Sequence, residues 1–192
     1  MTPYAIAVFL HVVGALGLFA AMGLEWVLVA RLRRVESAEQ ARDWLVLLDV
    51  IRRLSPASLA VLLLAGIYMA ATAWGGVGWI VVGFVALLLL PPLGMIAGLR
   101  LPAIRRELEN QRGPLPPGLR RRLDEPLFLA SIQIRTAISL GIVFLMTTKP
   151  DAAGSAVAIA VAVALGVSVS VPALNRARQR DRLSGPAASG RA

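Results

Sequence analysis

The chain contains no cysteine, and it has a single histidine among its 192 residues. The absence of cysteine excludes disulfides, thiolate catalysis, iron–sulfur clusters and cysteine-based zinc sites. The lone histidine excludes a multi-histidine metal site within one chain. Motifs of hydrolases, kinases, dinucleotide-binding folds and metalloproteases are also absent. The glycine-rich segments lie in apolar runs and turns, with no strand before them as a nucleotide-binding loop requires.

Charged residues are scarce at 16%, whereas 57% of the chain is hydrophobic and the mean hydropathy is +0.72. The apolar residues gather in long runs, and the first of them, Pro3 to Leu24, holds one group that titrates near neutral pH, His11. About 20 such residues, at ~1.5 Å each, cross the hydrocarbon core of a bilayer. The sequence therefore predicts an all-α, multi-pass membrane bundle of five transmembrane helices, over residues 4–30, 56–74, 77–99, 126–148 and 152–174.

Local signals predict where the helices begin and end. Ser37 to Gln40 fits a capping box, and apolar residues at helical spacing follow it, interspersed with charges. We expect an interfacial amphipathic helix over residues 38–53, with an ordinary extension of a neighbouring helix as the alternative. Ser55 fits an N-cap, and Pro56 after it fits the first position of a helix. The bundle then covers residues 1–175, and residues 176–192 form a basic, disordered tail.

The net charge of +9 is concentrated in alternate connections. Lysine and arginine cluster in residues 31–53, in residues 100–122 and after residue 175. This positive-inside pattern predicts a bacterial inner (plasma) membrane protein with its N-terminus outside and its C-terminus in the cytoplasm. The arginine clusters, such as Arg120 to Arg122, are then expected to meet anionic lipid headgroups. No nucleic-acid-binding motif accompanies the positive charge, so nucleic acid is not an expected partner.

Small residues recur on several apolar helices. One stripe repeats every fourth residue near the C-terminus, and it comprises Ala152, Ala156, Ala160, Ala164 and Ser168. Gly94 and Gly98 form a GxxxG motif just beyond Pro91-Pro92, where the missing backbone donors predict a kink. Such faces allow helices to approach closely, so we expect them to pack, and they permit a homodimer.

Two ionisable residues, Glu25 and Arg135, fall inside predicted transmembrane helices. Glu25 lies six residues before Arg31, about 9 Å from the helix end, and Arg135 lies nine residues after Pro126, about 13 Å from its own. Opposite charges at one depth are expected to pair, because each alone is unfavourable in a low-dielectric bundle.

The other residues of the predicted polar cluster lie near the same depth. Ser131 and Ser139 share a helical stripe with Arg135, and the kink at Pro91 is expected to free carbonyls that accept from Arg135. Three interpretations stay open for the cluster. It is a structural staple, a proton or substrate site, or a pair of charges that snorkel to the interface.

His11 lies in the first helix, 14 residues from Glu25 and thus about 21 Å along the axis and about 40° around it. One interpretation is a histidine hydrogen-bonded to a neighbouring helix. The other is a ligand of haem or copper, with Met69 or Met146 as the second ligand. Methionines at helical positions are usually core residues, so the methionine signal is weak.

Three segments resemble an uncharacterised bacterial integral-membrane family that is catalogued as a domain of unknown function. They are His11 with Gly14, Gly17 and Gly23, the stretch Ser55-Pro56 through Ala65-Gly66-Ile67-Tyr68, and the ending Met146-Thr-Thr-Lys149-Pro150. The resemblance covers about residues 4–150. That family is distantly similar to copper-resistance-D-like membrane proteins and to a membrane haem protein that oxidises protoporphyrinogen. The resemblance implies haem or copper on intramembrane histidines, a role that His11 matches.

Three hypotheses of function follow. The first is a non-enzymatic membrane protein, accessory or handling a small solute or ion, with a buried Glu25–Arg135 pair and no cofactor. The second is a haem- or copper-binding membrane redox protein that uses His11. The third is a membrane-embedded enzyme acting on a lipid or quinone, which only the basic loops suggest.

Overall fold

The computed structural model describes residues 2–183, apart from the side chains of residues 96, 97 and 176–183. This part of the chain is helical throughout except for short connections and one isolated bridge between Ser37 and Pro114. The elements are α1 (Pro3–Leu32), α2 (Ala38–Leu45), α3 (Leu47–Met69), the π-helical turn η1 (Ala70–Trp74), α4 (Gly78–Leu88), α5 (Leu90–Glu109), α6 (Pro117–Leu123), α7 (Pro126–Thr148) and α8 (Ala152–Leu183). The predicted all-α class is confirmed for the described residues.

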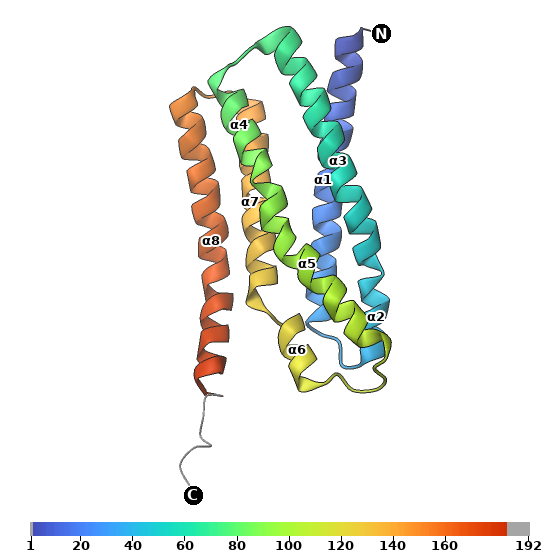
Figure 1. Cartoon of the computed structure of the whole chain (residues 1–192). Helices are drawn as coiled ribbons and strands as arrows, with labels where there is room; N and C mark the ends of the chain where they lie inside the picture. Colours follow the sequence, from blue (N-terminus) through green and yellow to red (C-terminus); the bar gives the residue numbers. More distant parts are fainter. Residues whose placement is uncertain (1, 184–192) are drawn as a thin grey trace, which may run out of the picture.

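Within the described residues, five helical segments are long and apolar enough to cross a membrane. Figure 1 shows them as two tight pairs, α1 with α3 and α7 with α8, joined by the diagonal α4 and α5. At one end α4 packs on α7 and α8, whereas at the other end α5 packs on α7 and α2. We call the end with α2 and α6 the basic end, and the end with η1 and the α7–α8 turn the aromatic end.

Glycines set the distance within both tight pairs. A Cβ added at Gly14 would lie 2.8 Å from the backbone nitrogen of Leu62, so only glycine lets α1 approach α3 this closely. In the same way, a Cβ at Gly166 of α8 would lie 2.8 Å from the Cα of Ile134 in α7. The predicted close packing of small residues on α1 is therefore present at Gly14. It is absent at Gly23, whose Cβ would meet nothing within 4 Å.

The small-residue stripe of α8 does not pack as expected. Its members are all exposed, although the first of them also lies against Gly78 of α4: Ala152, Ala156, Ala160, Ala164 and Ser168. The opposite face of α8 is buried instead, through Ser155, Ala162 and Ser170. Both faces carry small residues, so the four-residue repeat alone does not distinguish them. The glycines Gly141 and Gly166 determine which face α7 covers.

The basic end contains a compact apolar core made by residues from α1, α2, α5 and α6, including Leu32, Leu45, Leu108 and Leu119. Arg42 of α2 donates to the carbonyl oxygens of Leu108, Glu109 and Gln111, each at 3.2 Å, which satisfies the last carbonyls of α5. Arg105 donates to both carboxylate oxygens of Asp49, at 2.8 Å each. These contacts tie α2, α3 and α5 together below the spanning region.

The aromatic end is joined by side chains from four different segments. Trp74 and Trp79 meet edge to face with ring centroids 5.6 Å apart. The indole nitrogen of Trp74 donates to the hydroxyl of Tyr4 at 3.1 Å, and the ammonium of Lys149 lies 4.4 Å from the Trp74 ring centroid. Amphipathic aromatic rings of this kind suit a membrane–water interface.

Several predicted helix boundaries are wrong. The interfacial helix over 38–53 ends at Leu45, and residues 47–53 belong to α3, which passes straight through Ser55-Pro56. The N-cap signal at Ser55 is overridden because α3 packs along α1 and buries Leu48 and Ile51 against it. The capping box itself forms, since Ser37 accepts from the Gln40 amide at 3.3 Å, but Gln40 reaches back to the amide of Glu36.

Two further boundaries differ from the prediction. The break in the third spanning segment is present at Leu89, just before Pro91-Pro92, and α5 then continues to Glu109 rather than ending at residue 99. The predicted tail is partly helical, because α8 continues to Leu183. Residues 184–192 of that tail lie outside the described residues.

The matched pair Gly14 and Gly23 tests the close approach of α1 and α3. We predict that Gly14→Ala lowers the free energy of unfolding by about 1–3 kcal/mol, because the new methyl overlaps the backbone of Leu62. Gly23→Ala is predicted to be neutral or to stabilise by up to about 1 kcal/mol, through helix propensity alone. Thermal unfolding in detergent, followed by tryptophan fluorescence, measures both. Equal effects of the two changes would contradict the packing described.

Candidate functional site

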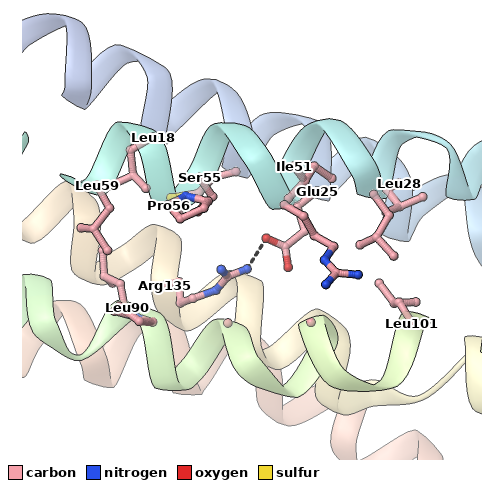
Figure 2. Close-up of a pocket in the computed structure, with 16 residues that line it drawn as sticks. Leu18, Glu25, Leu28, Ile51, Ser55, Pro56, Leu59, Leu90, Leu101 and Arg135 are labelled. Atoms are coloured by element: carbon pink, nitrogen blue, oxygen red, sulfur yellow. Dashed lines mark hydrogen bonds and ion pairs between the residues drawn. The ribbon is translucent and has the colours of Figure 1, made fainter. Parts of the chain in front are cut away.

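Glu25 of α1 and Arg135 of α7 form a buried ion pair, as their matched depths predict. Their exposed fractions are 6% and 8%, and the Arg135 Nη2 donates a hydrogen bond to Glu25 Oε2 (Figure 2). The next residue of each helix continues the contact, because the Trp26 indole donates to the Thr136 hydroxyl at 3.0 Å. Polar contacts therefore join α1 to α7 at this level.

A glycine makes room for the guanidinium of Arg135. A Cβ built on Gly94 of α5 would lie 2.7 Å from Nη1 of Arg135, so a larger residue there would displace the arginine. One half of the GxxxG motif thus accommodates a side chain instead of packing a helix. The other half, Gly98, has nothing within 4 Å of its built Cβ.

The two predicted serines are buried on the same face of α7 as Arg135. Ser131 donates to the carbonyl of Leu93 at 2.5 Å, and Ser139 donates to the sulfur of Met22 at 3.6 Å. The expectation that carbonyls near the Pro91 kink accept from Arg135 is wrong. Arg135 donates to Glu25 instead. Ser131 donates to the backbone of the kinked segment, because its short side chain lies directly against α5.

One polar atom of Arg135 is left without a partner. Its Nε is buried, yet it has no hydrogen-bond partner among the described residues. A buried donor left unsatisfied costs about 1–3 kcal/mol. The guanidinium is therefore only partly satisfied by the described residues.

A cavity of about 220 Å³ lies directly beside the ion pair (Figure 2). Its buried lining comes more from α1 than from any other helix, through Leu18, Met22, Glu25 and Leu28, and Arg135 is the lining residue from α7. The walls of the cavity are α3, which packs on α1, and α5, which packs on α7 and α2. The cavity thus lies between α3 and α5, which meet through Asp49 and Arg105 nearer the basic end.

The exposed residues of the lining mark where the cavity opens. They are Arg52 and Pro56 on α3, and Pro91 and Gly98 on α5. The mouth is therefore framed by these two helices and faces the side of the bundle. Pro91, predicted as part of the polar cluster, stands at this rim and makes no recorded polar contact to Arg135.

Arg52 belongs to the site although the sequence places it in an interfacial helix. The Cβ positions of Gly14 and Gly17 in α1 face Leu62 and Ser58 of α3. Continuing this antiparallel register along both helices puts Arg52 within a few Å of the level of Glu25. The sequence around Arg52 shows only a group of basic residues. Its position beside Glu25 depends on how α1 and α3 align, which the sequence does not show.

His11 lies between α1 and α3, at a distance from the ion pair. Its Nδ1 donates to the carbonyl of Leu62 at 3.1 Å, and the ring rests against Gly66. This agrees with a histidine bound to a neighbouring helix. Met146 instead packs near Gly83 of α4, and Met69 ends α3. Among the described residues, no group of three or more His, Cys, Asp or Glu is placed to hold a metal ion.

In comparisons with known proteins, no family model, curated protein or solved structure matched this chain. The resemblance to a bacterial membrane family therefore stays a prediction. The ion pair and the cavity are the features of the described residues that bear on function.

Single changes at the ion pair are predicted to cost far more than the double change. Glu25→Gln or Arg135→Leu leaves one charge buried without its partner, which costs about 3–5 kcal/mol in buried pairs. The double variant removes both charges and is predicted to recover most of that loss. A double-mutant cycle of unfolding free energies in detergent measures the coupling. Additive single effects would show that the two side chains do not interact.

Proposed function

We propose that this chain is a multi-pass integral membrane protein that handles a small solute or ion in the cavity beside Glu25 and Arg135, without catalysing a reaction. The observation that carries the proposal is an open cavity at the level of a buried ion pair whose guanidinium is incompletely bound. A purely structural staple needs no space beside it. Ionisable groups at membrane depth are costly and typically serve function.

The proposed setting is the bacterial inner membrane, with the N-terminus outside and the C-terminus in the cytoplasm. Two features support it. The segments rich in arginine gather at the basic end with α2 and α6, and the aromatic rings of Tyr4, Trp74 and Trp79 gather at the opposite end. By the positive-inside rule the basic end faces the cytoplasm, where its arginines meet anionic headgroups.

Access of water and small solutes to the cavity is measurable because the chain has no cysteine. Ser55 lines the cavity, whereas Ala57 is exposed on another face of the same helix at nearly the same depth. We predict that the cysteine of Ser55→Cys reacts with a small charged thiosulfonate at least about tenfold faster than that of Ala57→Cys, because only a hydrated thiol ionises to the reactive thiolate. Mass spectrometry of the reconstituted protein gives both rates.

Equal, slow modification at both positions would contradict a solute-accessible cavity. Fast modification at both would show that α3 is not embedded in lipid at this depth. Either result overturns the proposed function.

A second candidate is a haem- or copper-binding redox protein built on His11. The observation that favours it is the hydrogen bond from Nδ1 to the Leu62 carbonyl. This bond leaves Nε2 as the nitrogen with a free lone pair, which is how many metal-ligating histidines are oriented. The second ligand would come from Met69, Met146 or another copy of the chain, since the described residues offer no larger group of ligands.

The redox candidate predicts a Soret band or stoichiometric copper in the purified protein, and loss of that signal in His11→Ala. An optical spectrum with metal analysis measures both, and His11→Asn is the control because its side chain can still donate to the Leu62 carbonyl. A colourless, copper-free protein after expression with haem precursors and copper would leave His11 as a packing residue.

A further inference from the structure

The charge and shape of the cavity indicate the chemical class of its ligand, an inference that rests on the function proposed above. We propose that the cavity binds the head and first carbons of a single-chain anionic amphiphile, such as a long-chain fatty acid, which enters from the bilayer between α3 and α5. Charge, lining and the position of the mouth each support one part of this proposal.

The charged groups of the lining call for an anion. They are Glu25, Arg52 and Arg135, which together carry one net positive charge when all are ionised. Arg135 is 8% exposed, and its Nε has no partner among the described residues. Guanidinium groups bind carboxylate and phosphate oxygens especially well, through their planar set of donors. One oxyanion between Arg135 and Arg52 would neutralise the site.

The remainder of the lining is almost entirely apolar. Leu18, Leu59 and Leu90 line the part of the cavity nearer the aromatic end, and Ser55 supplies the one hydroxyl. The volume of about 220 Å³ lies below the ~300–1,000 Å³ of sites that enclose a drug-sized ligand. The cavity therefore fits an anionic head and a short length of hydrocarbon, and a long chain must leave through the mouth.

The mouth lies where such a chain can leave into lipid. Pro56 and Pro91 form its exposed rim on α3 and α5, and Pro91 is nine residues, about 13 Å, from Arg100 along α5. In a bilayer this rim faces hydrocarbon, whereas Arg52 lies nearer the basic end. An amphiphile with its head towards Arg52 and its chain in the bilayer matches both the charged and the apolar part of the cavity. A soluble anion would contact the charged part alone.

Two glycines provide a matched test of the mouth. Built Cβ atoms at Gly98, on the rim, and at Gly23, on the outside of α1, both meet nothing within 4 Å. Both positions therefore accept a Cβ without a backbone clash. We predict that Gly98→Leu weakens binding of tritiated palmitate to the full-length protein in detergent by at least about tenfold, because the side chain fills the mouth, while Gly23→Leu leaves it unchanged.

Adjacent arginines test the head group. Arg52 lines the cavity and Arg53 does not. Arg52→Gln is predicted to weaken palmitate binding several-fold, roughly as expected for loss of one partly exposed ionic contact, and Arg53→Gln to leave it unchanged. Unlabelled hexadecanol, which has the same chain without charge, is predicted to displace palmitate poorly.

Three outcomes would overturn the proposal. Equal displacement by hexadecanol would show that no anion is recognised, and displacement by millimolar inorganic phosphate would identify a soluble anion as the ligand. Equal binding by the Gly98 and Gly23 variants would place the palmitate elsewhere. The proposed function is tested separately, because fast modification of Ser55→Cys without palmitate binding would keep the solute-accessible cavity and reject only the fatty acid as its ligand.

Discussion

A carboxylate and a guanidinium inside a low-dielectric helix bundle must neutralise one another, and the contact between α1 and α7 depends on this constraint. The two helices belong to different tight pairs, and each makes its closest packing with another partner, α1 with α3 and α7 with α8. Three hydrogen bonds cross the boundary among the described residues: Arg135 to Glu25, Trp26 to Thr136 and Ser139 to Met22. Loss of either charge would therefore leave the other one buried without a partner, and it would also weaken the contact between the two helix pairs.

The same constraint explains the unusual path of α5. The guanidinium of Arg135 occupies the space that a side chain at position 94 would fill, so α5 approaches α7 through Gly94 and is held by Ser131 at the carbonyl of Leu93. Both α4 and α5 pack on α7, and the break at Leu89 lets α4 also reach α8 at one end of the bundle while α5 reaches α2 at the other. Because α5 packs on α7 and α2, it does not close against α3 at the level of Arg135, and the cavity lies between them.

Stability and function make different demands on this region. An ion pair used only as a staple would be most stable with every donor satisfied and no empty space beside it. Here a buried donor of Arg135 lacks a protein partner, and the space next to it is lined by leucine, glycine and proline. His11 presents the contrast, since its ring is bound to the Leu62 carbonyl and rests on Gly66 within a well-packed pair of helices. We therefore place the candidate function at the ion pair.

The sequence by itself determined the five apolar segments, the break near Pro91 and the pairing of Glu25 with Arg135. Each follows from local or one-dimensional quantities: length in apolar residues, a missing backbone donor, and depth counted from a helix end. Tertiary structure alone decided the start of α3 before Ser55, the buried face of α8, and the place of Arg52 and Gly94 beside the cavity. These depend on the rotation and register of helices distant in sequence. Close contacts such as Gly14 with Leu62 set that register. The sequence of one helix does not predict which residues of another helix it will contact.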